Sequence, residues 1–388
     1  MKNFFLILIC ISLCPLYVRA QESIGLKQLE WNEQNFKIIK NWHNNITHQK
    51  AERLLVLTDC DNTAWAGDIA DSVFSTAVKY KYITWANAQI LPEYPFKKKV
   101  SSTPIDYYDY LYSINPVISY NYAAQAFAGL TLANTYEIFK LAESQKDFPI
   151  PYEEMQNLFG TLSQAGITVG FTSASPLFIV APMVEKMGLD TPLWAIEGID
   201  IYVKDPSNGS GEVLLSNLIN SVGLKTWSDV IKYLGHLQIT PHVSEIINAR
   251  KGKSVSGVSI AHRYVTTWNR SHKNKTLAID QMRLAGVFGD NFGPFSDLPE
   301  ALPDESGNDQ GMLRALPLLT DGTLIVNIYK GIDKNGFIDM EKYVGSFRRF
   351  VNLTEQMKKI SHPTFVTQIA TYKGDQIGFR RMKAPQFE

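Results

Sequence analysis

Two aspartates and a threonine follow a run of aliphatic residues near the start of the chain. The segment LLVLTDCDNT, residues 54–63, places Asp59 and Asp61 one residue apart and Thr63 two residues further on. A short apolar run bounded by polar residues is typical of a strand buried on both faces of a parallel sheet. Carboxylates at the end of such a strand have the residue type needed for nucleophilic attack or for acid and base catalysis.

Other polar residues end later apolar runs. Ser173 follows the run 168–172, and Asp290 follows the run AGVFG. Because ligands of open α/β sheets bind at the carboxyl ends of the strands, we expect Asp59, Ser173 and Asp290 to converge on one crevice. Carboxylates gathered in one place repel one another unless a cation neutralises them, and an all-oxygen set favours Mg²⁺ over zinc. Magnesium in such a site keeps positions for water and a phosphate oxygen, which makes phosphoryl transfer the leading reaction class.

This residue set could divide phosphoryl transfer into two steps. One aspartate can attack phosphorus and form an acyl phosphate. A second carboxylate with a raised pKa can protonate the departing alcohol and later deprotonate the attacking water. A hydroxyl and a lysine can hold the charge that develops on the transferred group.

Strand patterns alternate with helical patterns over most of the chain. Further apolar runs occur at AGVFG and at LIVNI, residues 324–328, and a hairpin is expected between Ile199 and Leu214. Helical spacing occurs between residues 21 and 50, before Gly166, and from about Lys275 to Leu284. The alternation predicts an α/β fold with a doubly wound, Rossmann-like parallel sheet. Residues 226–253 show no clear pattern.

The segment after the first motif carries helical patterns without strands. Apolar spacing recurs through residues 69–144, interrupted by Pro92, Pro95, Pro104 and Pro116. We therefore expect a helical cap domain, residues 68–144, inserted after the first strand motif into a core domain of residues 21–67 and 145–388. Asp68 is expected to cap the first helix of this insert.

The ordered motifs resemble those of the haloacid dehalogenase superfamily of phosphatases. The shared features are D-x-D-x-T, the strand-end Ser173, Lys275 at a helix start, and Gly289-Asp290 followed by a further acidic residue. Within the superfamily the chain is most similar to secreted bacterial phosphorylcholine phosphatases. That similarity rests on DNT followed by an aromatic residue, PFK at 95–97, AAQAFAGLTL at 123–132, TSASP at 172–176, TTW at 266–268 and NDQGML at 308–313, and it spans roughly residues 51–328.

The resemblance implies a role for each motif residue. Asp59 would be the nucleophile and a metal ligand, and Asp61 the general acid and base that also offers its backbone carbonyl to Mg²⁺. Ser173 and Lys275 would hold the phosphate, with Lys273 as an alternative lysine, and Asp290 would be the third metal ligand.

The last acidic motif is longer than the superfamily usually has. Eighteen residues separate Asp309 from Asp290, and Asp297 is the rival for the supporting acidic role. We favour Asp309, because the sequence that follows it leads at a suitable distance into the strand LIVNI.

Aromatic residues are concentrated in the expected cap. Trp85 and the tyrosines could surround a quaternary ammonium group, because aromatic faces attract such cations. Packing in the interior is the alternative for any single ring. The residues are Trp85, Tyr107, Tyr108, Tyr110, Tyr112, Tyr120 and Tyr122.

Composition and the amino terminus indicate an exported protein. Lys2, the apolar stretch FFLILICISLCPLY and Val18-Arg19-Ala20 form a signal peptide pattern, residues 1–20. Of the 38 basic residues, the loss of Lys2 and Arg19 leaves 36 against 38 acidic ones, a balance that excludes a nucleic-acid binder by charge. Cys60 would be the single remaining cysteine, so we expect no intramolecular disulfide and a side chain directed into the core. We expect a periplasmic or secreted location and no membrane span after signal removal.

Two functions of different class remain in play at this level. The first is an exported, Mg²⁺-dependent phosphomonoesterase for a phosphocholine-like ester, or for another small organic phosphate such as phosphoserine. The second is a secreted binding protein for choline or phosphate ligands that has kept the fold without turnover. The oligomeric state is open.

Overall fold

The computed structural model describes residues 25–49, 54–84, 103–114, 116–207, 211–243, 283–290, 322–329, 363–373 and 376–379. The expected signal peptide, residues 1–20, lies outside these ranges.

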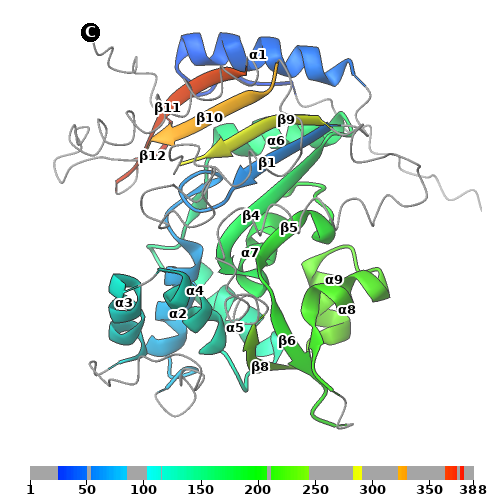
Figure 1. Cartoon of the computed structure of the whole chain (residues 1–388). Coiled ribbons are helices and arrows are strands. Elements are labelled where there is room, and N and C mark those ends of the chain that lie inside the picture. The colour runs from blue at the N-terminus through cyan, green and yellow to red at the C-terminus, as the bar shows by residue number, and fades with distance from the viewer. Residues whose placement is uncertain are drawn as a thin grey trace, which may run out of the picture.

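A parallel sheet forms the centre of the fold (Figure 1). Within the described residues it has seven strands in the order β12-β11-β10-β9-β1-β4-β5, and only the β11–β12 pair is antiparallel. The chain passes from β1 outward to β4 and β5 and then returns to the other side of β1 as β9. This reversal confirms the predicted doubly wound α/β class. The strands are β1 (Leu54–Asp59), β4 (Thr168–Pro176), β5 (Ile196–Ile199), β9 (Arg283–Gly289), β10 (Leu324–Tyr329), β11 (Thr364–Lys373) and β12 (Gln376–Phe379).

The apolar runs predicted the central strands, with some corrections at their ends. β1, β4 and β10 contain the expected runs, and β4 continues four residues beyond Thr172 to Pro176. The helix expected from Lys275 to Leu284 is wrong at its end, because Arg283 and Leu284 pair with Leu54 and Leu55 of β1. The strands β5, β11 and β12 were not predicted.

Two helices, α1 (Glu33–Thr47) and α6 (Glu153–Gln164), cover one face of this sheet. Phe171 of β4 and Phe288 of β9 both pair with Thr58 and so lie on the same face. Phe159 of α6 packs edge-on against both rings, with centroids 5.7 and 5.5 Å away. The ring of Trp42 in α1 packs against that of Phe288 with centroids 6.1 Å apart. The aromatic rings therefore hold both helices against β4 and β9, the two strands that flank β1 and its terminal Asp59.

Trp42 also makes a polar contact with the sheet. Its indole Nε1 donates to the carbonyl of Ala285 in β9 over 2.8 Å. Gly286 makes room for the ring, because a Cβ at that position would lie 2.8 Å from Trp42 Cζ2. Helix α1 is thus docked by a hydrogen bond inside an apolar contact.

Four helices follow the first motif: α2 (Ile69–Lys79), α3 (Pro104–Ile114), α4 (Pro116–Gln125) and α5 (Leu132–Glu143). They lie together below the sheet in Figure 1. The chain enters and leaves them through a two-stranded pair of β2 (Trp65–Ala66) and β3 (Ile150–Pro151), in which Trp65 pairs with Pro151. The exact boundaries of the expected cap domain, residues 68–144, stay a prediction.

A smaller sheet lies beside these helices. Its strands β6 (Ile201–Lys204), β7 (Val213–Leu214) and β8 (Gln238–Val243) have the order β7-β6-β8, and the antiparallel β6–β7 pair confirms the expected hairpin. Helices α8 (Leu215–Val222) and α9 (Trp227–Leu234) connect β7 to β8. The region without a clear sequence pattern therefore contains α9 and β8 as far as Val243.

Backbone hydrogen bonds join the small sheet to the helical segment. Gly129 N donates to the carbonyl of Ile239 over 2.9 Å, and Ile239 N donates to the carbonyl of Leu130 over 2.8 Å. The small sheet therefore contacts the helical segment, and the assignment of these residues to the core domain stays a prediction.

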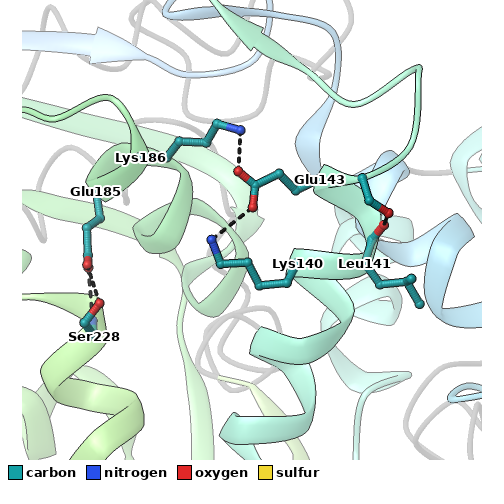
Figure 2. A network of polar contacts seen from close by, with 7 residues as sticks. Lys140, Leu141, Glu143, Glu185, Lys186 and Ser228 are labelled. Carbon is teal, nitrogen blue, oxygen red and sulfur yellow. Dashed lines mark hydrogen bonds and ion pairs between the residues drawn. The ribbon is translucent and has the colours of Figure 1, made fainter.

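Helix α7 (Leu177–Lys186) links the main sheet to both neighbouring groups of helices. Figure 2 shows two ion pairs on Glu143: Nζ of Lys186 lies 2.6 Å from one carboxylate oxygen and Nζ of Lys140 lies 3.0 Å from the other. It also shows Ser228 of α9, which donates a hydrogen bond to the carboxylate of Glu185. The hydrogen bond from Lys186 is the main reason that the pKa of Glu143 is lowered, and Lys140 adds to it. Such surface pairs contribute little stability. The short helix η2 (Leu193–Ala195) then leads into β5.

Substitution of Trp42 by phenylalanine tests the docking of α1. The change leaves the buried carbonyl of Ala285 without its indole donor, so the free energy of unfolding should fall by about 1–3 kcal/mol. Urea denaturation followed by circular dichroism measures this. Lys40 lies on the exposed side of the same helix, and Lys40→Ala should change the free energy of unfolding by less than about 0.5 kcal/mol. Equal effects of the two variants would contradict the docking of α1 through Trp42.

Candidate active site

A cavity of about 230 Å³ lies where the main sheet meets the helical segment. It collects side chains from β1, β4, β9 and the helices α2, α3 and α4. Its walls are formed by Asp59, Asp61, Asn62, Asp68, Ala70, Tyr108, Tyr112, Tyr120, Ala123, Ala174, Ser175, Pro176 and Asp290. Three of the aspartates selected from the sequence, Asp59, Asp61 and Asp290, therefore share one cavity.

The strand register explains why these residues meet. Asp59 is the last residue of β1 and pairs with Thr172 of β4, one residue before Ser173. On the other side, Thr58 pairs with Phe288 of β9, two residues before Asp290. The strand order reverses between β1 and β9, and this is the position at which doubly wound sheets bind ligands.

A tight turn after β1 places Asp61. The carbonyl of Cys60 accepts hydrogen bonds from the backbone N–H groups of Thr63, Ala64 and Trp65, over 3.2, 2.8 and 3.3 Å. Asn62 has the left-handed φ of 60° that this turn requires, a conformation that asparagine tolerates better than most residues. The side chain of Cys60 is buried, as expected.

The carboxylate of Asp61 accepts hydrogen bonds on both oxygens. Trp65 Nε1 and the backbone N–H of Ile69 donate to Oδ1, over 2.8 and 2.9 Å. Ser175 Oγ donates to Oδ2 over 3.0 Å, and Ser173 Oγ lies 3.5 Å from the same oxygen. Three separate elements, the turn, the start of α2 and the end of β4, thus fix the orientation of this side chain.

Burial, followed by the negative charge of Asp68, raises the pKa of Asp61 to about 8. The hydrogen bonds from Ile69, Trp65 and Ser175 act in the opposite direction. Low-dielectric surroundings favour the neutral form of a carboxyl group. A side chain held in this way is suited to giving and receiving a proton.

Ser173 and Ser175 occupy different positions at the end of β4. Ser173 is 4% exposed, does not line the cavity, and accepts a hydrogen bond from Ser175 N over 3.0 Å. Ser175 lines the cavity and is closer to Asp61. Sequence reasoning missed Ser175, although residues two apart share one face of a strand and both serines are part of TSASP.

Asp68 caps α2 as expected and also faces the cavity. Its side chain accepts from Asp71 N over 2.9 Å. Asp71 in turn accepts a hydrogen bond from Tyr108. The cavity therefore has carboxylates both at the sheet and at the start of α2.

Some of the expected cap aromatics line the cavity and others do not. Tyr108 and Tyr112 contribute to its wall together with Tyr120. The ring of Tyr112 lies 6.4 Å from that of Tyr108 and 5.9 Å from that of Tyr120. Tyr107 and Tyr110 do not line the cavity. Their rings stack on each other with centroids 6.1 Å apart, and the ring of Tyr107 also packs against that of Tyr122 with centroids 5.2 Å apart. The three rings on the wall form one continuous group.

Several predicted site residues lie outside the described residues. These are Lys275 and its alternative Lys273, the supporting Asp309 and its rival Asp297, and the aromatic Trp85. Their roles stay predictions.

The donor chemistry of the cavity fits a hard cation. Over the described ranges, no three His, Cys, Asp or Glu side chains are grouped so as to hold a metal ion. Asp59 and Asp290 both line the cavity, while hydrogen-bond donors hold the carboxylate of Asp61. Two carboxylates with water and a phosphate oxygen are a donor set that suits Mg²⁺.

A larger cavity of about 700 Å³ lies elsewhere, between α7, α8 and the start of α9. Its wall contains none of Asp59, Asp61 and Asp290. We assign the chemistry to the smaller cavity, because functional groups of suitable type converge there. In the part of the chain that the structure describes, no helix has the length and apolar character to cross a bilayer.

No family model and no curated protein matches the chain. Among solved structures it is similar to a substrate-bound phosphoserine phosphatase complex, at 13% identity over 72% of this chain and 87% of that one, with a TM-score of 0.34. It is also similar to a protein of unknown function from Anaerococcus prevotii DSM 20548, at 12% identity over 93% and 98%, with a TM-score of 0.47. A third similar structure is cytosolic 5'-nucleotidase IIIB bound to cytidine, at 14% identity over 88% of this chain and 98% of that one, with a TM-score of 0.37. These similarities are too distant to bear on activity, so the functional argument rests on the cavity itself.

Substitution of Gly198 by alanine tests how β5 positions the end of β4. A Cβ on Gly198 would lie 2.5 Å from the carbonyl oxygen of Ser175 and 2.8 Å from Leu177 N. Because backbone atoms must then move, the free energy of unfolding should fall by about 1–3 kcal/mol.

Gly160→Ala is the matched control for this variant. Gly160 lies within helix α6, and its nearest neighbour would be Leu189 Cδ2 at 3.8 Å. Alanine there should stabilise the protein by about 0.5–1 kcal/mol, since glycine is unfavourable inside a helix. Urea denaturation of both variants decides the matter, and a neutral Gly198→Ala would show that β5 does not constrain Ser175.

Proposed function

We propose that the protein is a Mg²⁺-dependent phosphomonoesterase that hydrolyses a small phosphate ester through an aspartyl-phosphate on Asp59. The observation that supports this most is the division of labour among carboxylates in one cavity. Asp59, Asp61 and Asp290 line this cavity together, and the carboxylate of Asp61 is held by its own set of donors. One aspartate is thus suited to attack and another to proton transfer.

The proposed reaction balances with these two residues. A carboxylate oxygen of Asp59 forms a bond to phosphorus while the bond to the ester oxygen breaks, and protonated Asp61 gives its proton to that oxygen, so that the alcohol leaves neutral. Water then attacks phosphorus, Asp61 takes a proton from the water, and phosphate leaves Asp59. Both carboxyl groups return to their starting states.

Asp59 and Asp290 would hold the Mg²⁺ ion, together with the backbone carbonyl of Asp61 that the superfamily resemblance implies. When bound, the cation offsets the negative charge of the phosphoryl group and of the clustered carboxylates. Ser173 and Lys275 remain the proposed phosphate-binding pair, and Asp309 the proposed supporting residue with Asp297 as its rival.

The walls of the cavity favour a leaving group with positive charge. Among the described residues that line it there is no Lys, Arg or His, whereas Asp68 and three tyrosines face it. Aromatic faces and a carboxylate together attract a quaternary or protonated amine. We therefore propose a phosphocholine-like substrate. The signal peptide pattern at residues 1–20 supports a periplasmic or secreted enzyme.

Replacement of Asp59 by asparagine should abolish turnover. An amide does not form the acyl phosphate, so kcat should fall about a thousandfold or more. The assay measures phosphate release from phosphocholine and from p-nitrophenyl phosphate with Mg²⁺, and again after EDTA treatment, which should stop the reaction until Mg²⁺ is restored.

Asp147→Asn serves as the control for the loss of one charge, because Asp147 is exposed and lies outside the cavity. Its kcat should stay within about twofold of the wild type. Turnover that survives in Asp59→Asn would overturn the nucleophile assignment. Ligand binding without turnover by the wild type on any monoester would instead indicate a non-catalytic choline or phosphate binding protein.

Replacement of Tyr112 by leucine tests the proposed leaving-group site. Loss of one aromatic face should raise KM for phosphocholine by roughly threefold to thirtyfold, the equivalent of about 0.5–2 kcal/mol of cation–π attraction. KM for p-nitrophenyl phosphate, which has no cation, should change by less than about twofold.

Tyr110→Leu is the matched control on the same helix, because Tyr110 does not line the cavity. It should leave the KM ratio of the two substrates unchanged. An amine-selective site would be ruled out if the ratio of KM for phosphocholine to KM for p-nitrophenyl phosphate were the same in Tyr112→Leu and Tyr110→Leu. It would also be ruled out if the wild type hydrolysed alkyl phosphates with uncharged or anionic leaving groups faster than phosphocholine.

A further inference from the structure

We propose that Ser175 is a positioning residue that holds Oδ2 of Asp61, the oxygen that transfers the proton. The inference rests on the phosphatase function proposed above. It adds a residue to the proton-transfer step that the sequence motifs did not include.

The two oxygens of Asp61 have partners of different chemical type. Oδ1 accepts from an indole N–H and from a backbone N–H, those of Trp65 and Ile69. Both groups are donors only and have no lone pair with which to accept a proton in return. Oδ1 must therefore stay an acceptor, and the exchangeable proton belongs on Oδ2.

Ser175 suits an oxygen that alternates between two states. A hydroxyl donates to Oδ2 when Asp61 is a carboxylate, and it can continue to do so when Asp61 is protonated, because Oδ2 keeps acceptor capacity while its proton faces the ester oxygen. Its Oγ is 3.0 Å from Oδ2. Ser173 suits this role less, because its Oγ is 3.5 Å away and already accepts from Ser175 N. Ser175 is thus the partner that keeps Oδ2 hydrogen-bonded throughout the reaction.

The fold fixes Ser175 in this position. The pairing register of β4 and β5 shifts between Thr172 and Pro176, which turns the end of β4 toward β5. Gly198 of β5 permits this close approach, since any side chain would meet the Ser175 carbonyl. Ser175 is 5% exposed and still lines the cavity. The hydroxyl is consequently held beside the place where the ester oxygen must depart.

Loss of the Ser175 hydroxyl should affect esters unequally. Protonation by a general acid matters most when the leaving oxygen is strongly basic, as in an alkyl ester, and least for p-nitrophenolate. A residue that acts on the phosphoryl group, or on stability, should affect both classes by the same factor. The ratio of the two rates therefore separates proton transfer from other roles.

The experiment compares full-length wild type, Ser175→Ala and Ser175→Thr with Mg²⁺. The alkyl ester is whichever of phosphocholine, phosphoserine and glycerol phosphate the wild type hydrolyses fastest, and the aryl ester is p-nitrophenyl phosphate. In Ser175→Ala, kcat/KM for the alkyl ester, which reports the steps up to departure of the alcohol, should fall between about tenfold and a hundredfold, as expected for a misplaced catalytic group. The aryl kcat/KM should change by less than about threefold, and threonine should restore most of the loss.

Two further variants act as controls. Thr172→Val removes a hydroxyl from the same strand that donates to the Thr58 carbonyl over 3.3 Å rather than to Asp61, so both rates should change by the same factor. Ser175→Cys replaces Ser175→Ala if the latter does not fold, because a thiol is a weak donor and should give the same selective loss.

Equal losses on both esters, a selective loss in Thr172→Val, or no rescue by threonine would overturn the role of Ser175 while leaving the phosphatase function intact. Absence of turnover by the wild type on all esters would overturn the phosphatase function and, with it, this inference.

Discussion

A carboxylate buried at the end of a sheet needs hydrogen-bond donors, and the site is organised around this requirement at Asp61. Its donors come from a turn, from the start of α2 and from the end of β4. None of these elements could move independently without leaving a buried oxygen of Asp61 without its donor, which costs about 1–3 kcal/mol. The hydrogen bonds therefore hold the helical segment and the main sheet in one relative position around the cavity.

The same requirement separates Asp61 from its neighbours. Donors from three elements hold its carboxylate, whereas Asp59 and Asp290 line the same cavity from the ends of β1 and β9. Its surroundings favour the neutral form, since it is buried and faces Asp68. Carboxylates of one chemical type thus acquire different surroundings from their positions alone, as the proposed two-step phosphatase mechanism requires.

The contact between the helical segment and the rest of the chain also limits how the site can change. Phe127, just after α4, packs against Phe178 of α7 with centroids 5.1 Å apart, and Gly129 and Leu130 hydrogen-bond to β8. These contacts hold the end of the segment that contains α4 and α5 against α7 and the small sheet. Tyr108 and Tyr112 lie on α3, whose packing among the described helices is mainly against α4 and α2. The proposed selection of the leaving group would therefore depend on α3, in the outer part of the segment.

The sequence by itself determined the fold class, the central strands and the convergence of Asp59 and Asp290, because buried parallel strands are continuous apolar runs and their carboxyl ends share one edge. It did not reveal β5, β11 or β12, nor that β4 extends to Pro176, since pairing with neighbouring strands decides where a strand ends. Only the tertiary structure placed Ser175 on Asp61 and separated Tyr112, on the cavity wall, from Tyr110. Those assignments depend on register and on packing between distant segments, which local patterns do not encode.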